Sequence, residues 1–463
     1  MNIDPQLVAE LPAELPALEW ITDRSRVERL SQDFYWFSPA LKRDLEGRFG
    51  DIAVRPRTEA EISQVVAACA CRGIPIVLRG SGTGNYGQAI PLHGGVILDL
   101  SAYNQFGWVQ DGVGRAQAGI RLADFDKQSR PAGWELRWLP STFRTATLGG
   151  LFGGGFGGAG SITYGPVAAP GNVLGVRVMS VEPEPKIIEL RGAEAMLLHH
   201  VYGTNGIVLE LEVALAPAMP WMECIASFDT FDGALTFASA FSSAPGMVKK
   251  EVCLLSATTA AYMGQLAEFL PAGRHAVLLV SSQPSEDAML DMVRANGGTI
   301  TYRKTAEELR AMSRTLIEYT WNHTTLHALK IDKSLTYLQT GFDPKRFTEQ
   351  VKALENQLGG PDGEVLMHLE FLRTKEGLPN CSGLQIVRFK SFERLEEIMQ
   401  IHRDHGVNIN NPHVYIVEDG KQGALPAAVV DMKTRLDPQG LLNPGKLRAW
   451  KQPAAASAAA LTA

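Results

Sequence analysis

Short apolar runs alternate with amphipathic stretches through the first half of the chain. One amphipathic stretch begins at Thr58, whose hydroxyl is placed to cap a helix, and it stops at Gly73. The apolar runs around it begin at Ala53 and cover Ile76–Leu78 and Val96–Leu100. The pattern therefore predicts a strand–helix–strand–loop–strand unit.

The alternation continues to Pro217 and then changes character. It first predicts a helix from Leu122 and strands at Ala116–Gly119, Trp134–Leu139, Val173–Val181 and Ile207–Leu215. Further on it predicts helices between strands at Cys224–Phe228, Ala276–Ser281, Thr299–Tyr302, Val365–Phe371 and Leu384–Phe389. We expect this second set to form an antiparallel sheet, which makes the fold class α+β. A helix at Leu425–Leu436 and the segment after it are expected to return to the first half.

A glycine-dense loop joins the second and third strands of the first unit. Its residues Gly82–Gly87 match the GxGxxG expression of Rossmann folds, but that assignment requires a helix to open at once. Pro91 and the glycine pair after it exclude such a helix. The loop instead predicts a nest of backbone N–H groups for a diphosphate, with Arg79 adding charge, or else a hairpin that needs glycine only for positive φ.

A second glycine block follows. Residues 148–160 contain eight glycines. Because each glycine costs a helix ~1 kcal/mol relative to alanine, we expect no regular helix there. A bound ligand or a close approach of backbone must account for them.

Four motifs resemble those of the vanillyl-alcohol-oxidase/p-cresol-methylhydroxylase (PCMH) family of FAD enzymes. In chain order they are RGSGTGNYGQA from Arg79, PSTFRTATLGGLFGGGFGGAGSITYG from Pro140, YGTNGIV from Tyr202 and DPQGLLNPGK from Asp437. The relatives that this resemblance implies include alcohol oxidases and 2-hydroxy-acid dehydrogenases.

The resemblance implies a PCMH-type FAD-binding fold of two α/β subdomains and an α+β cap domain over an antiparallel sheet. The implied parts are an N-terminal helical segment (1–45), the FAD-binding domain (46–217), the substrate or cap domain (218–420), a C-terminal segment returning to the FAD domain (421–450) and a disordered tail (451–463). The residues that match flavin contacts of the family are Arg79, Gly80, Ser81, Gly82, Thr83, Gly84, Asn85, Gln88, Pro140, Ser141, Thr142, Thr147, Leu148, Gly149, Gly150, Gly153, Gly154, Gly157, Gly158, Gly206, Ile207, Val208 and Asn443.

One departure from the family bears on how the flavin is attached. Branches with covalent FAD carry a histidine in the first loop, where this chain has Thr83, and some add a cysteine in the second block. Pro140–Gly165 contains no cysteine. We therefore expect FAD to be bound non-covalently.

The base that takes the substrate's hydroxyl proton must come from outside the flavin loops, which offer Gly, Ser and Thr. His323 and His327 stand four residues apart on one face of a predicted helix. His413 and Tyr415 alternate onto one face of a predicted strand. These four are the catalytic candidates, and histidine, with a pKa of ~6.5, is the readier base at neutral pH. The structural alternative is that the histidines are solvated or bonded within the core.

A metal is the competing use of such residues. Two histidines four apart with a carboxylate have ligand spacing, and the 2-hydroxy-acid branch of the family has a His/His/Glu site in its cap. That branch's HxGDGNxH run is absent here, so we expect no metal. His368 and Glu370 are either a further catalytic pair or an ion pair within a sheet. The aromatic residues that would line a substrate pocket, or else belong to the core, are Trp221, Trp321, Tyr337 and Phe371.

The amino-acid composition narrows the class of protein to which this chain can belong. The 463 residues carry a formal net charge of -6 and are 45% hydrophobic, which describes a globular chain without a basic face for nucleic acid. Five cysteines without CxxC spacing argue against a disulfide framework and suit a reducing compartment. The N-terminus lacks a signal-like pattern and no apolar run approaches ~18 residues, so we expect a cytoplasmic protein without a membrane span.

These features predict an FAD-dependent oxidase or dehydrogenase. Its reaction would oxidise a CH–OH group of a small alcohol, phenolic alcohol or hydroxy acid by hydride transfer to flavin N5. The expected partners are a small-molecule substrate and an electron acceptor, oxygen or a carrier, with self-association left open. Two alternatives remain: a flavin-carrying binding or sensor protein without turnover, and a 2-hydroxy-acid dehydrogenase with a cap metal. A Rossmann NAD(P) dehydrogenase is excluded by the missing helix.

Overall fold

The computed structural model describes residues 5–420 and 425–451. All but the first residue of the predicted tail therefore lies outside the described residues. Helices and strands are mixed along the chain, as the predicted α+β class requires. The division into domains stays a prediction.

A small, mostly parallel sheet carries the first glycine loop. Its order is β1-β2-β4-β3, and β4 runs parallel to both β2 and β3. The strands are β1 Trp20–Ile21, β2 Ile52–Val54, β3 Ile76–Arg79 and β4 Val96–Asp99. Helix α4 (Glu59–Arg72) is capped by the Thr58 side chain and ends at Gly73, whose φ is 65°. The predicted unit is confirmed, and its glycine loop leaves the carboxyl end of β3, where α/β sheets bind ligands.

The second sheet is antiparallel and has the order β5-β6-β10-β8-β9, with β7 pairing β10. Its strands are β5 Phe106–Gln110, β6 Val113–Gln117, β7 Trp134–Leu136, β8 Val173–Met179, β9 Ile187–Arg191 and β10 Ile207–Pro217. Helix α5 (Leu122–Ser129) packs Leu122 and Phe125 into the core of this sheet.

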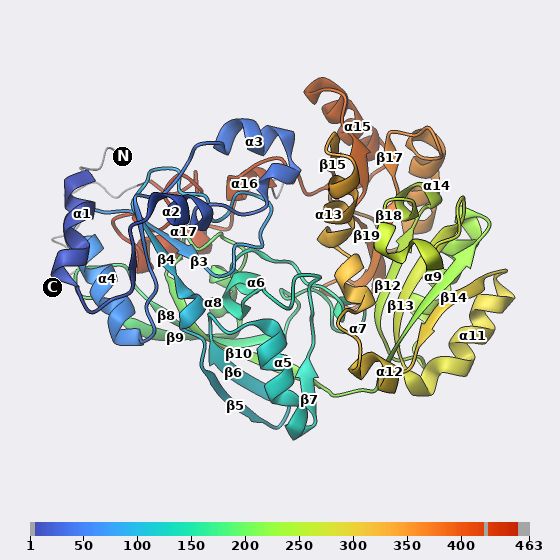
Figure 1. The fold of residues 1–463 in the computed structure, drawn as a ribbon, viewed down its shortest axis with the longest axis horizontal. Helices are drawn as coiled ribbons and strands as arrows, with labels where there is room; N and C mark the ends of the chain where they lie inside the picture. The colour runs from blue at the N-terminus through green and yellow to red at the C-terminus, as the bar shows by residue number, and fades with distance from the viewer. Residues whose placement is uncertain (1–4, 421–424, 452–463) are drawn as a thin grey trace.

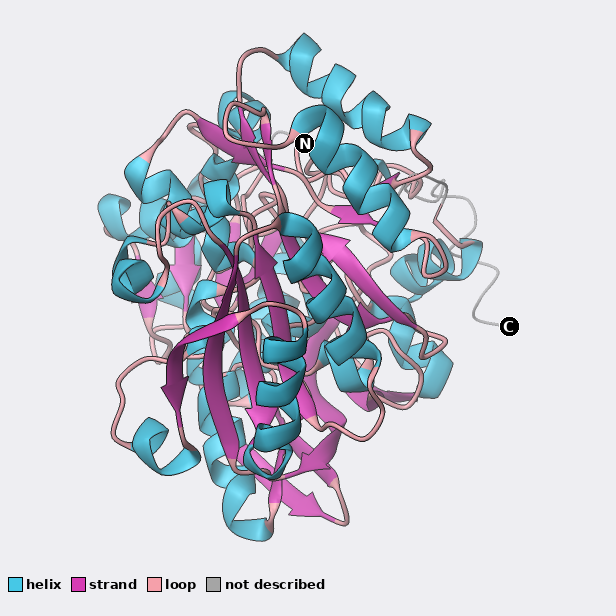
Figure 2. Cartoon of the chain, turned by 90° about the vertical axis from the view of Figure 1, so that its right-hand side faces the viewer, coloured by secondary structure: helices cyan, strands magenta, loops and turns pink. Residues whose placement is uncertain are grey.

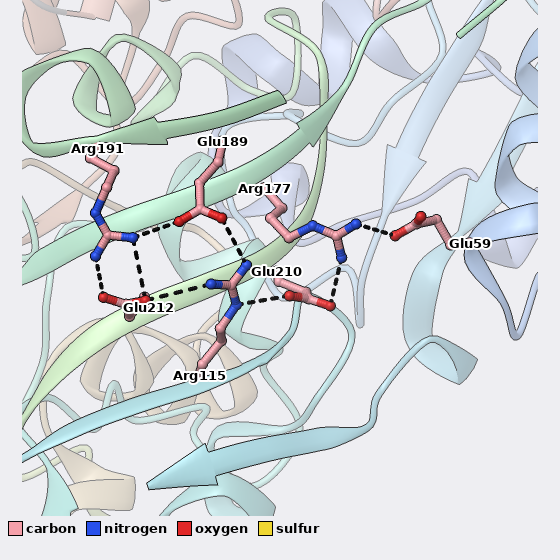
Figure 3. A network of polar contacts seen from close by, with 7 residues as sticks. All are labelled: Glu59, Arg115, Arg177, Glu189, Arg191, Glu210 and Glu212. Carbon is pink, nitrogen blue, oxygen red and sulfur yellow. Dashed lines mark hydrogen bonds and ion pairs between the residues drawn. The ribbon is translucent and has the colours of Figure 1, made fainter. Parts of the chain in front are cut away.

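Charged side chains cover part of this second sheet (Figure 3). Arg115 on β6 pairs with Glu210 and Glu212 on β10, at N–O distances of 2.8 and 3.5 Å. Arg177 on β8 joins Glu210 to Glu59 of α4. The network of these partly buried pairs therefore ties the second sheet to the helix of the first.

The second half of the chain forms an eight-stranded sheet of order β14-β11-β13-β12-β18-β19-β16-β21 and a three-stranded sheet β15-β20-β17. The strands of both are β11 Trp221–Phe228, β12 Lys249–Leu255, β13 His275–Ser282, β14 Thr299–Lys304, β15 Leu335–Tyr337, β16 Thr340–Gly341, β17 Val365–Leu366, β18 His368–Arg373, β19 Pro379–Gly383, β20 Ile386–Arg388 and β21 Asn408–Ile409. The strand pairings within these sheets are antiparallel, as expected. Figure 2 shows helices lying across the large sheet.

Two predictions about these strands need correction. The predicted strand Val365–Phe371 is interrupted at Met367, and its halves β17 and β18 belong to different sheets. Strand β12 was not predicted, because its sequence opens with Lys249, Lys250 and Glu251, all of which are buried. Because buried charged residues interrupt the alternation of apolar and polar positions, a strand that contains them is not recognised from that pattern.

The remaining helices connect these sheets or cover them. Their bounds are α1 Pro5–Glu14, α2 Arg24–Leu30, α3 Pro39–Leu45, α6 Leu148–Gly154, α7 Ser161–Tyr164, α8 Gly192–Ala195, α9 Phe231–Ser243, α10 Ala257–Ala260, α11 Glu286–Ala295, α12 Ala306–Arg310, α13 Asn322–Ile331, α14 Phe347–Leu358, α15 Phe392–Asp404, α16 Val417–Gly420 and α17 Ala427–Leu436.

The end of the chain returns to the first sheet, as expected. Helix α17, red in Figure 1, packs Met432 and Leu436 against the second sheet, and the segment after it forms a bridge from Leu442 to Ile76. Ile76 N–H donates to the Leu441 carbonyl (2.8 Å), and Asn443 N–H donates to the Ile76 carbonyl (2.8 Å). The C-terminal motif thus extends the sheet whose loop carries the first glycine motif.

The buried Glu223 carboxyl predicts a pH dependence of stability. It lies on β11, where it accepts the Leu316 N–H (2.9 Å), and burial raises its pKa to about 7. Since the folded pKa is the higher one, this group contributes stability that is fully present below its unfolded pKa of ~4.3 and is lost as the pH rises through about 7. Glu223→Gln should therefore raise the melting temperature at pH 8 relative to wild type, but not at pH 4. Glu307→Gln, at an exposed position, is the control; equal shifts for both variants at pH 8 would contradict the assignment.

Candidate active site

A cavity of about 620 Å³ lies between the two glycine blocks and the strands of the second half. The first block reaches it from the β3–β4 loop and the second from the stretch around α6. Of the residues predicted to hold a cofactor, those that line it are Arg79, Gly80, Ser81, Gly82, Thr83, Gly84, Asn85, Gln88, Pro140, Ser141, Thr142, Thr147, Gly149, Gly150, Gly153, Gly154, Gly157, Gly206 and Val208. Segments separated by more than a hundred residues therefore meet around one space.

Four of the predicted cofactor residues do not line the cavity. Leu148 and Ile207 are buried in hydrophobic clusters, where they anchor α6 and β10. Gly158 lies against the backbone of Leu139 and Pro140, so its missing side chain serves backbone packing. Asn443 lies behind the lining, and its Nδ2 donates to the carbonyls of Gln88 (2.8 Å) and Tyr202 (2.7 Å). We assign these four to support of the lining residues.

The two glycine blocks are held against each other. Gln88 Nε2 donates to the Gly154 carbonyl (2.8 Å), and the Ser81 hydroxyl donates to the Thr145 carbonyl. A side chain at Gly80 would collide with the Thr147 hydroxyl. Glycine at position 80 therefore lets the two loops approach each other.

Arg79 has a different immediate role from the one predicted. Its guanidinium lines the cavity, but one nitrogen donates to the carbonyls of Leu30 (2.7 Å) and Gln32 (2.6 Å). Gly82, with φ 65°, lies directly over this guanidinium. In this structure Arg79 holds the loop to the connection after α2, and its charge lies at the cavity wall.

A buried pair of ionisable groups lies beneath the first loop. The Asp33 carboxylate lines the cavity and accepts the N–H groups of Tyr35 (2.9 Å) and Ala89 (3.3 Å). Lys446, from the C-terminal motif, donates to the Gly87 carbonyl (2.6 Å). Burial raises the pKa of Asp33 to about 6 and lowers that of Lys446 to about 7. Asp33 could not be singled out from the sequence, because it is a lone aspartate outside every motif.

Several residues with strained backbone conformations lie around the cavity. Among the described residues, five that are not glycine have positive φ, and three of them line the cavity: His200 (54°), Tyr202 (55°) and Trp321 (52°). A fourth, Asn443 (41°), holds Tyr202 and Gln88 as described above. Such conformations cost ~1–3 kcal/mol each and tend to occur at functional sites, so they mark this cavity independently of the glycines.

The lining fits FAD. Gly153 lies on α6, yet a Cβ added there would meet no protein atom within 4 Å, so the space that glycine leaves opens into the cavity. Asn85 is buried, and its Nδ2 has no partner among the described residues, which leaves a donor for a ligand. Glycine-rich backbone and an unused amide suit a diphosphate and a flat ring. Part of the second block is nevertheless the helix α6, capped by Thr147, contrary to our expectation.

The structure separates the four catalytic candidates from the cavity lining. His413 and Tyr415 lie in a turn and the stretch before α16, not on a strand. His413 Nδ1 contacts the Ser38 hydroxyl (2.8 Å), and burial lowers its pKa to about 4. Tyr415 lies under the Lys446 ammonium.

The histidine pair on α13 also faces inward. His323 Nδ1 and His327 Nε2 both contact the Glu318 carbonyl, at 3.1 and 3.3 Å. His327 stacks on Tyr319, and burial lowers its pKa to about 4. These contacts match the structural alternative. The residue of this segment that reaches the cavity is Trp321, with Asn322 beside it.

His368 and Glu370 belong to a fully buried polar cluster in the large sheet. His368 Nε2 is 2.7 Å from Glu370 Oε1, and its Nδ1 is 3.0 Å from the Leu384 carbonyl. With Cys253 they are the group of potential metal ligands that converges among the described residues. Of the predicted aromatic wall, Trp321 lines the cavity, whereas Tyr337, Phe371 and Trp221 belong to or pack against hydrophobic clusters.

Sequence reasoning missed several lining residues. They are Tyr86, His199, His200 and Tyr202 from the first half, and Asn322, Gln339, Lys375, Asn410 and Asn411 from the second. Tyr86 bridges the halves, because its hydroxyl donates to Gln339 Oε1 (2.6 Å). Tyr202 opens the YGTNGIV motif, and its strained backbone was the one feature that pattern alone could not show.

Comparison with known proteins identifies the class of domain. Residues 50–190 match the family model described as FAD binding domain. An uncharacterized FAD-linked oxidoreductase of Mycobacterium tuberculosis is 30% identical over 39% of this chain and 41% of its own length. The glycolate oxidase subunit GlcD of Bacillus subtilis is 26% identical over 86% of this chain and 88% of its own.

The fold has solved counterparts. A structure of alkyldihydroxyacetonephosphate synthase superposes with a TM-score of 0.67 over 96% of this chain and 86% of the other, at 16% identity. The matches confirm FAD as the predicted cofactor, and they agree with the predicted class of FAD-dependent oxidase or dehydrogenase. Among the described residues, no helix is long and apolar enough to cross a membrane.

Proposed function

We propose that this protein oxidises a CH–OH group of a small alcohol, phenolic alcohol or hydroxy acid with non-covalent FAD as its cofactor. The observation that carries the proposal is the single cavity lined jointly by both glycine blocks and by residues of the second half. An enzyme needs such a joint space, because substrate and cofactor must touch. The similarity to a glycolate oxidase subunit supports a hydroxyl-bearing substrate.

Different segments of the chain would contact different parts of the cofactor. The loop Gly80–Gly84 and Asn85 would hold the diphosphate, and the segment Thr147–Gly154 would lie along the rest of the cofactor. When bound, FAD supplies the acceptor for the hydride of the oxidised C–H bond. Thr83 in the cavity lining offers no side chain for a covalent histidyl link.

The proton of the substrate hydroxyl needs an acceptor at the cavity. We assign this role to His199 or His200, which line it, in place of the four candidates that do not. Imidazole has a pKa of ~6.5 and can accept a proton at neutral pH. Tyr86, whose pKa burial raises to about 12, stays protonated at neutral pH and already donates its hydroxyl proton to Gln339.

The test is anaerobic reduction by a panel of alcohols and 2-hydroxy acids. We expect one class of compound to bleach the oxidised-flavin absorbance of the purified protein, and a substrate deuterated at the carbinol carbon to bleach it more slowly. Dithionite serves as the control that the bound flavin can be reduced. Bleaching by dithionite but by no member of the panel would contradict the proposal and favour the binding or sensor protein.

A 2-hydroxy-acid dehydrogenase with a cap metal is the second candidate. It is favoured by the convergence of Cys253, His368 and Glu370, but the hydrogen bonds within this cluster already use both imidazole nitrogens. Elemental analysis and dialysis distinguish the metal-free oxidoreductase from the metal-dependent dehydrogenase. We expect no stoichiometric metal in the purified protein, and turnover that survives dialysis against a chelator.

A further inference from the structure

Trp321 has a backbone conformation that requires an explanation. Its φ and ψ are 52° and −138°, although bulky residues avoid positive φ. It is 8% exposed, lines the cavity, and immediately precedes α13. A conformation of this kind persists only where its surroundings hold it.

Two buried carboxyl groups hold this tryptophan at both ends. Glu370 Oε1 accepts its backbone N–H (2.6 Å), and Glu251 Oε2 accepts its indole N–H (2.9 Å). Both carboxyl groups lie in the large sheet and are essentially inaccessible to solvent. Burial raises the pKa of Glu251 well above its usual range and that of Glu370 to about 7, so the pair shares at most one negative charge near neutral pH.

The indole therefore has no polar group left for the cavity. Its ring centroid is 6.5 Å from that of Phe156, and it packs with Leu372 and Leu384. Phe156 and Leu384 also line the cavity, and Phe156 is 44% exposed. These residues form one apolar patch.

Amide side chains border this patch. Asn322 follows Trp321 directly, and its Oδ1 has no partner among the described residues. Gln339, Asn410 and Asn411 from the second half also belong to the cavity lining. Amides without a fixed charge suit hydroxyl groups, whereas the apolar patch would be left unfilled by a substrate as small as glycolate.

We propose that Trp321 is the specificity-determining wall of the substrate pocket, against which a flat, apolar part of an alcohol packs, and that Glu251 and Glu370 are positioning residues for it. The inference rests on the proposed oxidoreductase function and names the substrate class of that site. The hydroxyl of the substrate would lie toward the amides.

The experiment compares two probes, benzyl alcohol and glycolate, by their perturbation of the flavin spectrum of the holoprotein. We expect wild type to bind benzyl alcohol more tightly than glycolate. Trp321→Gly, which suits the positive φ and so preserves the backbone, should weaken benzyl alcohol binding about tenfold or more and leave glycolate binding and FAD content unchanged. Trp108→Ala, at an exposed position on β5, is the control and should change nothing.

Two substitutions of Glu251 test its role in positioning Trp321. Glu251→Gln mimics the protonated carboxyl and should bind benzyl alcohol as wild type does, whereas Glu251→Ala leaves the indole N–H without its acceptor and should weaken binding as Trp321→Gly does. Unchanged affinity in Trp321→Gly, or no preference of wild type for benzyl alcohol, overturns the inference while bound FAD remains. Loss of the proposed function is distinguishable, because no compound of the panel would then bleach the flavin of wild type.

Discussion

Replacing Gly153 with alanine is expected to stabilise the FAD-free protein and to weaken FAD binding at the same time. Gly153 lies within α6, where alanine is favoured over glycine by ~1 kcal/mol. A Cβ at this position meets no protein atom within 4 Å, so the chain itself has no use for glycine there. The methyl group would instead occupy cavity space, at a cost of ~1–3 kcal/mol, or roughly 5- to 150-fold in Kd.

The test is specific because the same substitution is expected to raise the stability of the FAD-free protein and to lower its affinity for FAD. Melting of the FAD-free protein and titration of FAD by fluorescence quenching give the two quantities. Gly233→Ala is the matched control, because Gly233 also lies in a helix, α9, but not at the cavity. An unchanged Kd for FAD in Gly153→Ala would mean that the cofactor does not lie where the glycines are.

Replacing Lys433 with methionine is expected to be the most destabilising change. The Lys433 ammonium is buried and donates to the carbonyls of Thr204 (2.9 Å) and Leu442 (3.0 Å) and to the Asp437 carboxylate. It thus joins α17 to the loop before β10 and to the C-terminal motif. Methionine would leave Asp437 as a buried charge without its cation, which costs ~3–5 kcal/mol. We expect a clearly lower melting temperature and weaker FAD binding.

Two controls accompany this variant. Lys352→Met removes a lysine from an exposed pair with Asp232 (3.1 Å) and should cost only ~0–1 kcal/mol. Adding Asp437→Asn to Lys433→Met removes the stranded charge and should restore part of the lost stability. If Lys433→Met destabilised the protein no more than Lys352→Met, the ammonium would not be joining these segments.

Helix-capping and turn preferences correctly predicted the strand–helix–strand–loop–strand unit of the first sheet. Thr58 and Gly73 bound α4 as a cap and a stop residue should, and the apolar runs on either side of this helix became β2 and β3. The glycine loop followed from Pro91, which excludes the Rossmann helix. These features depend on neighbours in sequence, so a pattern can show them.

The sequence could not show which candidate side chains reach the cavity, because that depends on the tertiary fold. Periodicity placed His323 with His327 and His413 with Tyr415, but it could not show that each imidazole would find a partner within the protein. The same limit hid β12, whose charges are satisfied by distant groups: Lys250 pairs with Glu135 (2.7 Å), and Glu251 accepts from Trp321. His200 and Tyr202 were missed because backbone strain has no sequence signature in a residue other than glycine.

The most direct test of the account is the flavin content of the purified protein. We predict a yellow protein with one FAD per chain, and colour that passes entirely into the supernatant on acid precipitation, because Thr83 and the cysteine-free second block offer no covalent link. Colour retained in the pellet would contradict non-covalent binding. A colourless protein that takes up no added FAD would contradict the central claim that the glycine-lined cavity exists to hold a flavin.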